Sequence, residues 1–324
     1  MLRTNEALEP PELHALGGVE RIVMMYNACS SNFTAAEARV GALLDDQDRL
    51  RSHPDISVTY VETSPDPAVT VARVRSVPAG SVIFGICGDG TASTILGSSL
   101  VPVLLAGGGN ADDLPHMIHG SRYRSELSSI VHNAVLRPLR PLDIDIQPPD
   151  AAVRRIKAFG YFTNGFTAQA ADRLDQARIR ERNLGRWRHM GEEALVCAQA
   201  MANIQSFDIT TTQGNERYGE IAFLTGNRMA KTTYPRATKI FETGASAAYI
   251  RHPNGVAIVG AMAKMAVGFG SHFADYDSFT YTVNQAEPIL AQADGEVFSL
   301  TEGTTVSVQL SAQTVPVITA RAAA

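Results

Sequence analysis

Two short apolar runs, Val82–Ile86 and Val101–Leu105, are free of charged residues. Each is rich in β-branched residues or leucine, which is typical of a buried strand in a parallel sheet. A glycine-rich turn follows each run, Gly88–Thr91 after the first and Gly107–Asn110 after the second, and a helical pattern follows each turn. The pattern therefore predicts two neighbouring strand–turn–helix units whose turns lie at the same edge of one sheet.

The chain around these runs has the same rhythm of strand and helix. Strands are predicted at Arg21–Asn27 and Ser57–Glu62, and helices at about 34–51, 66–77 and 127–136. The first helix is predicted from a capping box, in which Thr34 precedes Glu37 by three residues. Strands that alternate with helices in this way predict a parallel sheet.

After residue 137 the pattern changes to many short strand-like segments. Four prolines fall between residues 137 and 149, and Leu142–Gln147 alternates apolar and polar residues. Further strands are predicted at 154–162, 206–212, 220–224, 237–242, 247–250, 256–259, 278–283, 288–292 and 304–310, with one helical stretch at about 168–203. Short strands separated by glycine, proline and asparagine turns indicate an antiparallel sandwich or barrel.

This change of rhythm predicts two domains, since 324 residues are long for one hydrophobic core. We expect an α/β fold at 20–137, a Rossmann-like nucleotide-binding domain with a parallel sheet. We expect an antiparallel β-sandwich at 138–310 that holds the acceptor, with the active site in the cleft between the domains. The tail at 311–324 could return to the first domain.

Composition and charge restrict the class of protein. The net charge of −5 at pH 7 argues against non-specific binding to nucleic acid. No apolar run reaches about 18 residues, and the acidic, proline-containing N-terminus does not resemble a signal peptide. The three cysteines lack metal-site spacing and fit a reducing compartment. We therefore expect a cytoplasmic protein without a metal centre built from its own side chains.

Glycine turns after parallel strands are where α/β proteins bind nucleotides, because bare backbone lets phosphate approach and helix N-termini favour anions. One such turn would be an ordinary loop, whereas two in succession favour a nucleotide site. Asp89, inside the first turn, would repel phosphate unless it holds a metal ion or accepts a proton.

Several short motifs follow one another in a specific order. They are the serine-rich turn Asn27–Asn32, Thr63 at the end of the second strand, Cys87–Thr91 (CGDGT), Gly107–Asn110 (GGGN), Gly165–Ala168 (GFTA), Arg182–Arg188 (RNLGRWR) and Asp294–Glu296 (DGE). In this order they resemble the diacylglycerol kinase catalytic-domain family, which includes bacterial lipid kinases and sphingosine and ceramide kinases and is distantly related to NAD kinases. The resemblance extends over about residues 21–318.

Three positions depart from the family pattern. Cys87 replaces the first glycine of the G-G-D-G-T signature, Gly108 replaces a serine or threonine, and Ala28 replaces a proline. Gly108 lacks a hydroxyl that could contact phosphate. These changes leave open a specialised or weakened kinase.

The resemblance implies that the protein binds ATP, with Mg²⁺ arriving chiefly on the nucleotide phosphates. The implied catalytic residues are Asp294 as the base near the acceptor, Asp89, and Glu296, which would orient the base or a Mg²⁺-bound water. The implied nucleotide-binding residues are Asn27, Ser31, Thr63, Gly88, Gly90, Thr91, Gly109, Asn110, Arg182 and Arg188. Arg182 and Arg188 would point about 120° apart on a regular helix, so either the helix bends or only one of them contacts the nucleotide.

The acceptor is expected to be a hydroxyl of a lipid or long-chain alcohol. The apolar stretch 256–273 could line a lipid slot, and contact with the membrane would then be peripheral. A kinase of a soluble metabolite and a nucleotide-binding regulator without catalysis remain as alternatives, and the sequence allows an oligomer.

Overall fold

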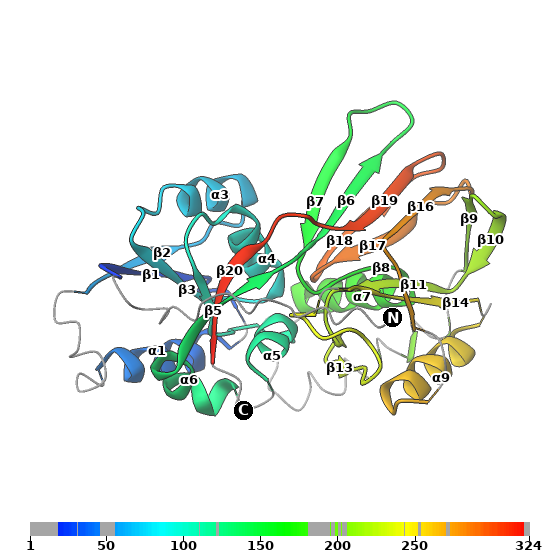
Figure 1. Cartoon of the computed structure of the whole chain (residues 1–324). Helices are drawn as coiled ribbons and strands as arrows, with labels where there is room; N and C mark the ends of the chain where they lie inside the picture. The colour runs from blue at the N-terminus through cyan, green and yellow to red at the C-terminus, as the bar shows by residue number, and fades with distance from the viewer. Residues whose placement is uncertain are drawn as a thin grey trace, which may run out of the picture.

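The computed structural model describes residues 19–30, 32–45, 56–109, 111–120, 123–180, 195, 198–199, 202, 206–242, 244–251, 254–269 and 273–320. The molecule has two parts that lie side by side, an α/β part and a β-sandwich part (Figure 1). The predicted fold class is therefore confirmed.

The α/β part is built on a six-stranded sheet with the order β2-β1-β3-β4-β20-β5. Its strands are β1 (Arg21–Tyr26), β2 (Ser57–Glu62), β3 (Ser81–Ile86), β4 (Val103–Leu105), β5 (Ala134–Leu139) and β20 (Val315–Ala320). Its helices are α1 (Phe33–Asp45), α3 (Pro67–Arg75), α4 (Asp89–Ser98), α5 (Asp113–His119) and α6 (Tyr123–His132). Neighbouring strands are parallel from β2 to β20, and β5 is antiparallel to β20.

Both faces of this sheet are covered, as its sequence pattern requires. All six residues of β3 are buried, and the four central residues of β1 are buried. One apolar cluster packs Ile22, Val82 and Phe84 against α1 and α6, and a second packs Ile83 and Val103 against α4 and α5. A strand buried on both faces has no polar alternation, which explains the unbroken apolar runs.

The second part consists of two six-stranded antiparallel sheets. The upper sheet has the order β10 (Gly214–Tyr218), β9 (Phe207–Thr211), β16 (Ser278–Val283), β19 (Thr305–Leu310), β6 (Leu142–Gln147), β7 (Arg154–Ala158). The lower sheet has the order β15 (Phe273–Asp275), β14 (Ser246–Ile250), β11 (Glu220–Leu224), β8 (Tyr161–Gly165), β17 (Ile289–Ala293), β18 (Glu296–Leu300). A short ribbon of β12 (Arg228–Met229) and β13 (Thr232–Thr233) completes the described strands.

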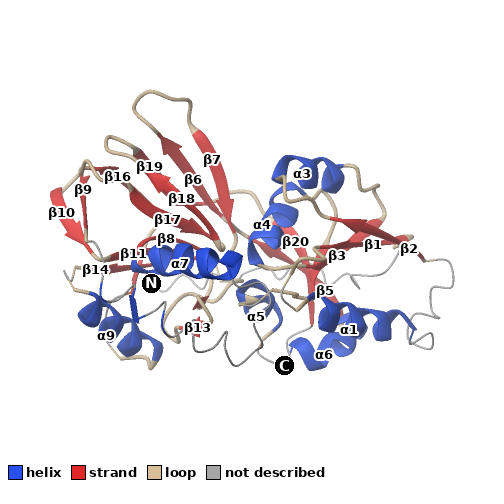
Figure 2. Cartoon of the chain, turned by 180° about the vertical axis from the view of Figure 1, so that it is seen from behind, coloured by secondary structure: helices blue, strands red, loops and turns tan. Residues whose placement is uncertain are grey.

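The sandwich core lies between the two sheets. Leu142, Ile144 and Ile146 of β6 point into it alternately, as the pattern predicts. Helices α7 (Phe166–Arg180) and α9 (Gly255–Ala266) lie against the lower sheet on the side away from the upper sheet (Figure 2). The outer face of the lower sheet is therefore covered by helices.

Several predicted elements are wrong in detail. The segment 256–259 is the start of helix α9, because the Asn254 side chain caps it by accepting the N–H of Ala257 at 2.8 Å. Residues 237–242 form turns, and the helix predicted at 127–136 ends at His132, before strand β5. Thr34 lies inside α1, so the predicted capping box is not the helix start. The helix predicted to residue 203 lies outside the described residues for most of its length beyond Arg180.

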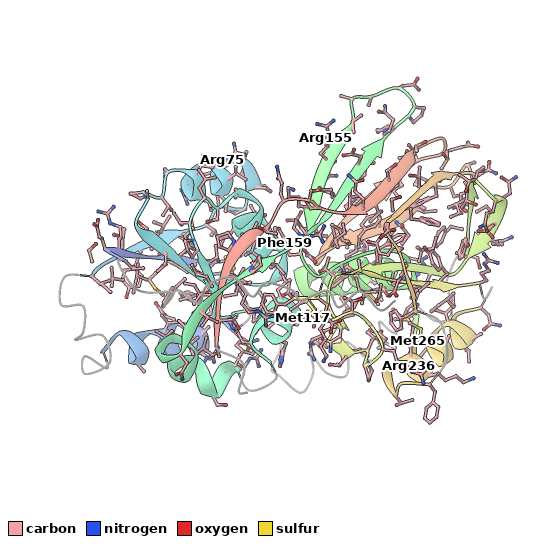
Figure 3. The ribbon with its side chains drawn as sticks, viewed as in Figure 1. Arg75, Met117, Arg155, Phe159, Arg236 and Met265 are labelled. Carbon is pink, nitrogen blue, oxygen red and sulfur yellow. The ribbon has the colours of Figure 1, made fainter. Side chains whose placement is uncertain are left out.

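Apolar side chains and crossing backbone segments join the two parts. Phe159, from the sandwich part, is fully buried in the apolar cluster under α4 and α5, and Figure 3 shows it at the junction. The two segments that connect the parts are hydrogen-bonded to each other, Ser311 N–H to Pro141 O and Arg140 Nε–H to Ser311 O, both at 2.9 Å. No helix in the described residues is both long and apolar enough to cross a membrane.

Candidate active site

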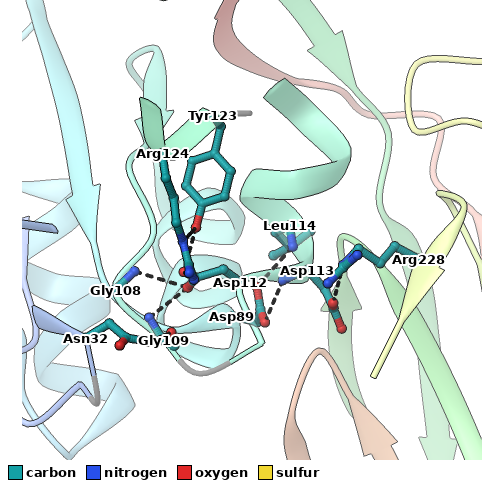
Figure 4. A network of polar contacts seen from close by, with 10 residues as sticks. All are labelled: Asn32, Asp89, Gly108, Gly109, Asp112, Asp113, Leu114, Tyr123, Arg124 and Arg228. Carbon is teal, nitrogen blue, oxygen red and sulfur yellow. Dashed lines mark hydrogen bonds and ion pairs between the residues drawn. The ribbon is translucent and has the colours of Figure 1, made fainter. Parts of the chain in front are cut away.

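The acid of the first glycine turn binds the start of helix α5. Asp89 accepts the N–H of Asp113 and the N–H of Leu114, one on each carboxylate oxygen and both at 3.0 Å (Figure 4). The first N–H groups of a helix have no partner within the helix, so a carboxylate there is favourable. Asp89 is itself the first residue of α4, so this one side chain joins two helices at the edge of the sheet.

The second glycine turn is closed by an internal carboxylate. Asp112 accepts the N–H of Gly108 at 3.0 Å and that of Gly109 at 2.7 Å on one oxygen. Its other oxygen accepts from the hydroxyl of Tyr123 and the guanidinium of Arg124, each at 2.6 Å (Figure 4). The N–H groups of Gly108 and Gly109 thus already have Asp112 as a partner, and the nucleotide-binding role of Gly109 stays a prediction.

The two glycine turns also pack directly against each other. A Cβ atom at Gly109 would lie 2.6 Å from the Cα of Gly88, and one at Gly108 would lie 3.0 Å from the backbone nitrogen of Cys87. Real Cβ atoms essentially never approach as closely as 2.6 Å, so Gly109 requires glycine for space, and the contact at Gly108 is tight because the neighbouring atoms are backbone. Packing thus gives a reason for glycine at position 108 in place of the serine or threonine of the family pattern, because the backbone of Cys87 lies where a side chain would begin.

Three buried acids gather at this edge, and two of them have an arginine partner. Asp112 pairs with Arg124, and Asp113 pairs with Arg228 of β12 at 2.7 Å. Within the described part of the chain, Asp89 has no ion-pair partner, and its hydrogen-bond donors are backbone N–H groups. Burial, followed by the charge of Asp113, raises the pKa of Asp89 to about 8. A carboxyl group with this pKa changes its charge near neutral pH and suits proton transfer.

Asp294 has a different environment. It occupies a left-handed turn between β17 and β18, with φ of 45°, and 1% of its surface is exposed. One oxygen accepts the N–H groups of Gly160 at 2.8 Å and Tyr161 at 2.9 Å, and the other accepts from the N–H of Phe159 and the hydroxyl of Ser93. Burial raises the pKa of Asp294. Four donors occupy its acceptor positions, so this carboxylate fastens the sandwich part to α4.

A cleft of about 860 Å³ lies beside the first glycine turn, which is within the usual range for small-molecule sites. Among the predicted site residues, Gly90 and Glu296 line it. Its walls come from α3 and α4 on one side and from β6, β7 and β18 on the other. Burial raises the pKa of Glu296, although the charge of Arg154 opposes the shift. The cleft therefore lies where the two parts meet.

The other predicted residues lie at the ends of the expected strands. The Oδ1 of Asn27 accepts the N–H of Cys29 at 3.0 Å after β1, and the Thr63 hydroxyl donates to the carbonyl of Tyr26 at 3.1 Å after β2. Gly88 and Thr91 lie in and just after the first glycine turn. Ser31, Asn110, Arg182 and Arg188 lie outside the described residues. The roles assigned to all of these residues stay predictions.

Sequence reasoning missed several residues that line the cleft. Ser93, Thr94 and Gly97 follow Gly90 at helical spacing on α4, so the stripe that they form could have been found from periodicity. Arg75, Arg154 and Lys157 also line the cleft. Their basic character is visible in the sequence, but their common location depends on long-range folding.

Solved structures with the same arrangement of elements include three that are informative. A Bacillus anthracis str. Sterne protein assigned provisionally as a diacylglycerol kinase has a TM-score of 0.62 at 13% identity and covers 98% of this chain and 100% of its own. A diacylglycerol kinase from the same organism has a TM-score of 0.57 at 11% identity with the same coverage. Yeast NADH kinase in complex with NADH has a TM-score of 0.50 at 10% identity and covers 94% of this chain and 84% of its own.

The chain has the fold of these kinases. The predicted resemblance to the diacylglycerol kinase family is thereby confirmed at the level of fold. No family model matches the sequence, and no curated protein is similar to it in sequence. Function therefore has to be argued from the residues at the site.

Proposed function

We propose that this protein is an ATP-dependent phosphotransferase that phosphorylates a hydroxyl group. The observation that carries the proposal is Asp89, a carboxyl group of raised pKa held at the start of α4, next to Gly90 in the wall of the cleft. Phosphoryl transfer needs a base for the hydroxyl proton and fixed groups that hold the phosphates. The kinase fold of the solved structures supports the same reading.

We assign the base to Asp89 in preference to Asp294. Asp89 uses one acceptor position on each oxygen for the N–H groups of α5, which leaves a second position on each. It is 9% exposed, whereas Asp294 is 1% exposed and accepts four hydrogen bonds. Asp89 therefore keeps acceptor positions for a hydroxyl of the substrate, whereas those of Asp294 are taken.

Basic side chains on both walls of the cleft can offset phosphate charge. Arg75 comes from α3, and Arg154 and Lys157 come from β7. Lys157 is tied to Asp143 at 2.7 Å, and the Arg154 guanidinium lies 4.8 Å from the centre of the Phe298 ring. We propose that Arg154 and Arg75 approach the nucleotide phosphates from opposite walls, and that Glu296 orients groups between them.

Magnesium would be held chiefly by the phosphates of ATP. In the described part of the chain no group of three or more histidine, cysteine, aspartate or glutamate side chains is arranged to hold a metal ion. A magnesium ion would keep most of its ligands from water and nucleotide, and Glu296, which lines the cleft, could serve as its protein ligand. When bound, the ion would neutralise charge on the transferring phosphoryl group.

The acceptor that we propose is a lipid or long-chain alcohol, reached by peripheral contact with a membrane. Helix α9 turns an apolar face outward, because Val256 and Val267 are 76% and 67% exposed and Phe269, which follows the helix, is 69% exposed. Residues 254–269 contain no acid, and Lys264 is the charged residue among them. An apolar face with one cation suits the interface of a bilayer.

Two experiments test the proposal. Transfer from γ-labelled ATP should be screened over diacylglycerols, sphingoid bases, long-chain alcohols and soluble polyols, and transfer to none of them would contradict the proposed activity. Gly90→Val should remove ATP binding in calorimetry and leave the fold intact, since its Cβ would lie 3.2 Å from Glu296 Cγ, inside the cleft. Transfer to soluble polyols alone would favour the alternative of a metabolite kinase.

A further inference from the structure

A second cavity, of about 600 Å³, lies against the C-terminal half of helix α5. Residues 116–120 of α5, together with β5 and β20, form its wall in the α/β part. Residues of the β12–β13 ribbon and the turn 239–242 form its wall in the sandwich part. The cavity thus bridges the two parts at a place that the proposed phosphotransfer does not use.

The charge around this cavity favours an anion. Three of its lining residues, Arg137, Arg228 and Lys239, are basic, and Glu242 is the acid among them. The Arg137 guanidinium lies 4.0 Å from the centre of the Phe241 ring, which holds it at the cavity wall. Arg137 and Lys239 are both exposed at the cavity and have no carboxylate partner among the described ion pairs.

His119, which lines the cavity, has a ring nitrogen that accepts no hydrogen bond from the described residues. Its Nε2 lies 3.0 Å from the carbonyl oxygen of Leu105, so Nε2 carries the proton and donates. Burial lowers the pKa of His119 to about 4, so the ring is neutral at physiological pH. Its Nδ1 is therefore an acceptor, and this buried atom has no hydrogen-bond partner in the described structure. A hydroxyl group entering the cavity would satisfy it.

We propose that this cavity binds a small phosphorylated polyol, with the phosphate between Arg137 and Lys239 and a hydroxyl donating to His119. The two cations select an anion, and the neutral imidazole selects a donor beside it. Thr233 and Asn227 line the same cavity and provide further polar groups for hydroxyls.

Arg228 connects this cavity to the catalytic edge. It lines the cavity and also donates from Nε to Asp113, whose own N–H donates to Asp89. An anion held by Arg137 and Lys239 also attracts Arg228, which lines the same cavity, and so weakens the Arg228–Asp113 ion pair. Asp113 then keeps the N–H of Lys231 as a partner, but its less compensated charge makes ionisation of Asp89 less favourable. Occupancy of the cavity therefore lowers the activity of the proposed site.

Binding can be measured without any catalytic assay. Calorimetry with ribose 5-phosphate should show binding to the wild-type protein, and the Arg137→Ala/Lys239→Ala double variant should bind at least about tenfold more weakly. Lys264→Ala, on α9 and remote from the cavity lining, is the matched control and should bind like wild type. Ribose without phosphate should bind more weakly than ribose 5-phosphate. Absence of wild-type binding at millimolar concentration, or equal affinity in the double variant, would overturn the site.

The inhibition of catalysis by a ligand in this cavity rests on the proposed function, and it is measured separately, as a change in the rate of phosphotransfer. Saturating ribose 5-phosphate should lower kcat/KM several-fold in the wild-type protein and leave the double variant unchanged. Arg137 and Lys239 are exposed, so the double variant should keep the wild-type unfolding transition and basal rate. An equal effect on both proteins would overturn the connection, and binding without any phosphotransfer would contradict the proposed function alone.

Discussion

At the scale of single residues, Asp89 and Asp294 show how partners decide the role of a buried carboxylate. Both are buried, and both accept backbone N–H groups. Asp89 keeps unused acceptor positions, and its charged neighbour Asp113 raises its pKa further. The hydrogen bonds to Asp294 each favour its ionised form and oppose the effect of burial. One group is therefore suited to exchange a proton, and the other to hold two parts together.

The pH dependence of the rate should report Asp89. A base acts in its ionised form, and the pKa of Asp89 is raised from 3.8 to about 8, so ionisation increases as the pH rises through 8. We expect kcat/KM to rise about tenfold per pH unit below 8 and to level off above it. Asp89→Asn should lower kcat by roughly 10²–10⁴-fold. Steady-state rates between pH 6 and 9.5 provide the measurement, and a flat profile would contradict the assignment.

Asp294→Asn should lower the free energy of unfolding. The new NH₂ group would face two buried N–H donors in place of an acceptor, and each unpaired donor costs about 1–3 kcal/mol. We expect a loss of about 2–6 kcal/mol in urea titration. Asp275→Asn, at an exposed position, is the control. A variant of normal stability whose kcat falls by roughly 10²–10⁴-fold would instead restore Asp294 as the base.

The residues of this site could be predicted only in part. Asp89 and Gly90 lie in a motif that is continuous in the sequence, so the motif alone placed them at the edge of the sheet. The donors to Asp294 come from residues 133 to 135 and 201 positions away, and no local pattern reports them. The role of Asp112 depends on the fold of the turn that it closes, so no local pattern indicates it.

At the scale of elements, the pair of glycine turns forms a single packed unit. The Asn32 side chain, which precedes α1, donates to the carbonyl of Gly109 at 2.6 Å, so the loop after β1 joins the same unit. The loops that follow the neighbouring parallel strands β1, β3 and β4 are thereby held together at the carboxyl edge of the sheet. The sequence predicts that these loops lie close together. Their packing decides which backbone N–H groups keep no hydrogen-bond partner within the protein.

Gly109→Ala should destabilise this unit. Its Cβ would lie 2.6 Å from the Cα of Gly88, so the two turns would have to separate. Overpacking of this kind costs about 1–3 kcal/mol. Gly260→Ala is the matched control, because a Cβ there meets nothing within 4 Å and alanine favours a helix. Denaturant unfolding of both variants is the measurement, and equal stabilities would contradict the packing argument.

Helix α9 shows why some elements were predicted wrongly. Its first turn contains Val256, Ile258 and Val259, a run of β-branched residues that local propensity assigns to a strand. The alternative, a helix started by Asn254, depends on a cap and on Met265 and Ala261 packing against the lower sheet. By contrast, β2, β11 and β16 have the predicted bounds, since each is a short run of strand-forming residues that is contiguous in the sequence.

At the scale of the whole molecule, the two parts present different surfaces. The α/β part meets the sandwich through the shared apolar cluster and through the Asp113–Arg228 pair. The exposed apolar face of α9 lies on the sandwich, at the lower right in Figure 1. Under the proposed function, this separation would let one part hold the nucleotide while the other approaches a membrane.

Charge placed on the α9 face should weaken binding to vesicles. Val267→Glu/Phe269→Glu should reduce co-sedimentation with phosphatidylcholine vesicles at least about tenfold, because two exposed apolar side chains would become anions. Leu100→Glu, at a position that is 83% exposed after α4, is the control and should bind like wild type. Unchanged binding by the double variant would contradict this face as the contact, and activity on soluble acceptors should stay the same.

The placement of β20 has a consequence for how the protein is made. This strand pairs with β4 on one side and β5 on the other, although the whole sandwich, from Leu142 to Leu310, precedes it in the sequence. A ribosome therefore releases the sandwich before it releases the strand that fills the sheet of the α/β part. Until then β4 and β5 each expose an open edge, which other chains could pair with. Nascent chains stalled before residue 315 should consequently be the species that chaperones hold and proteases remove.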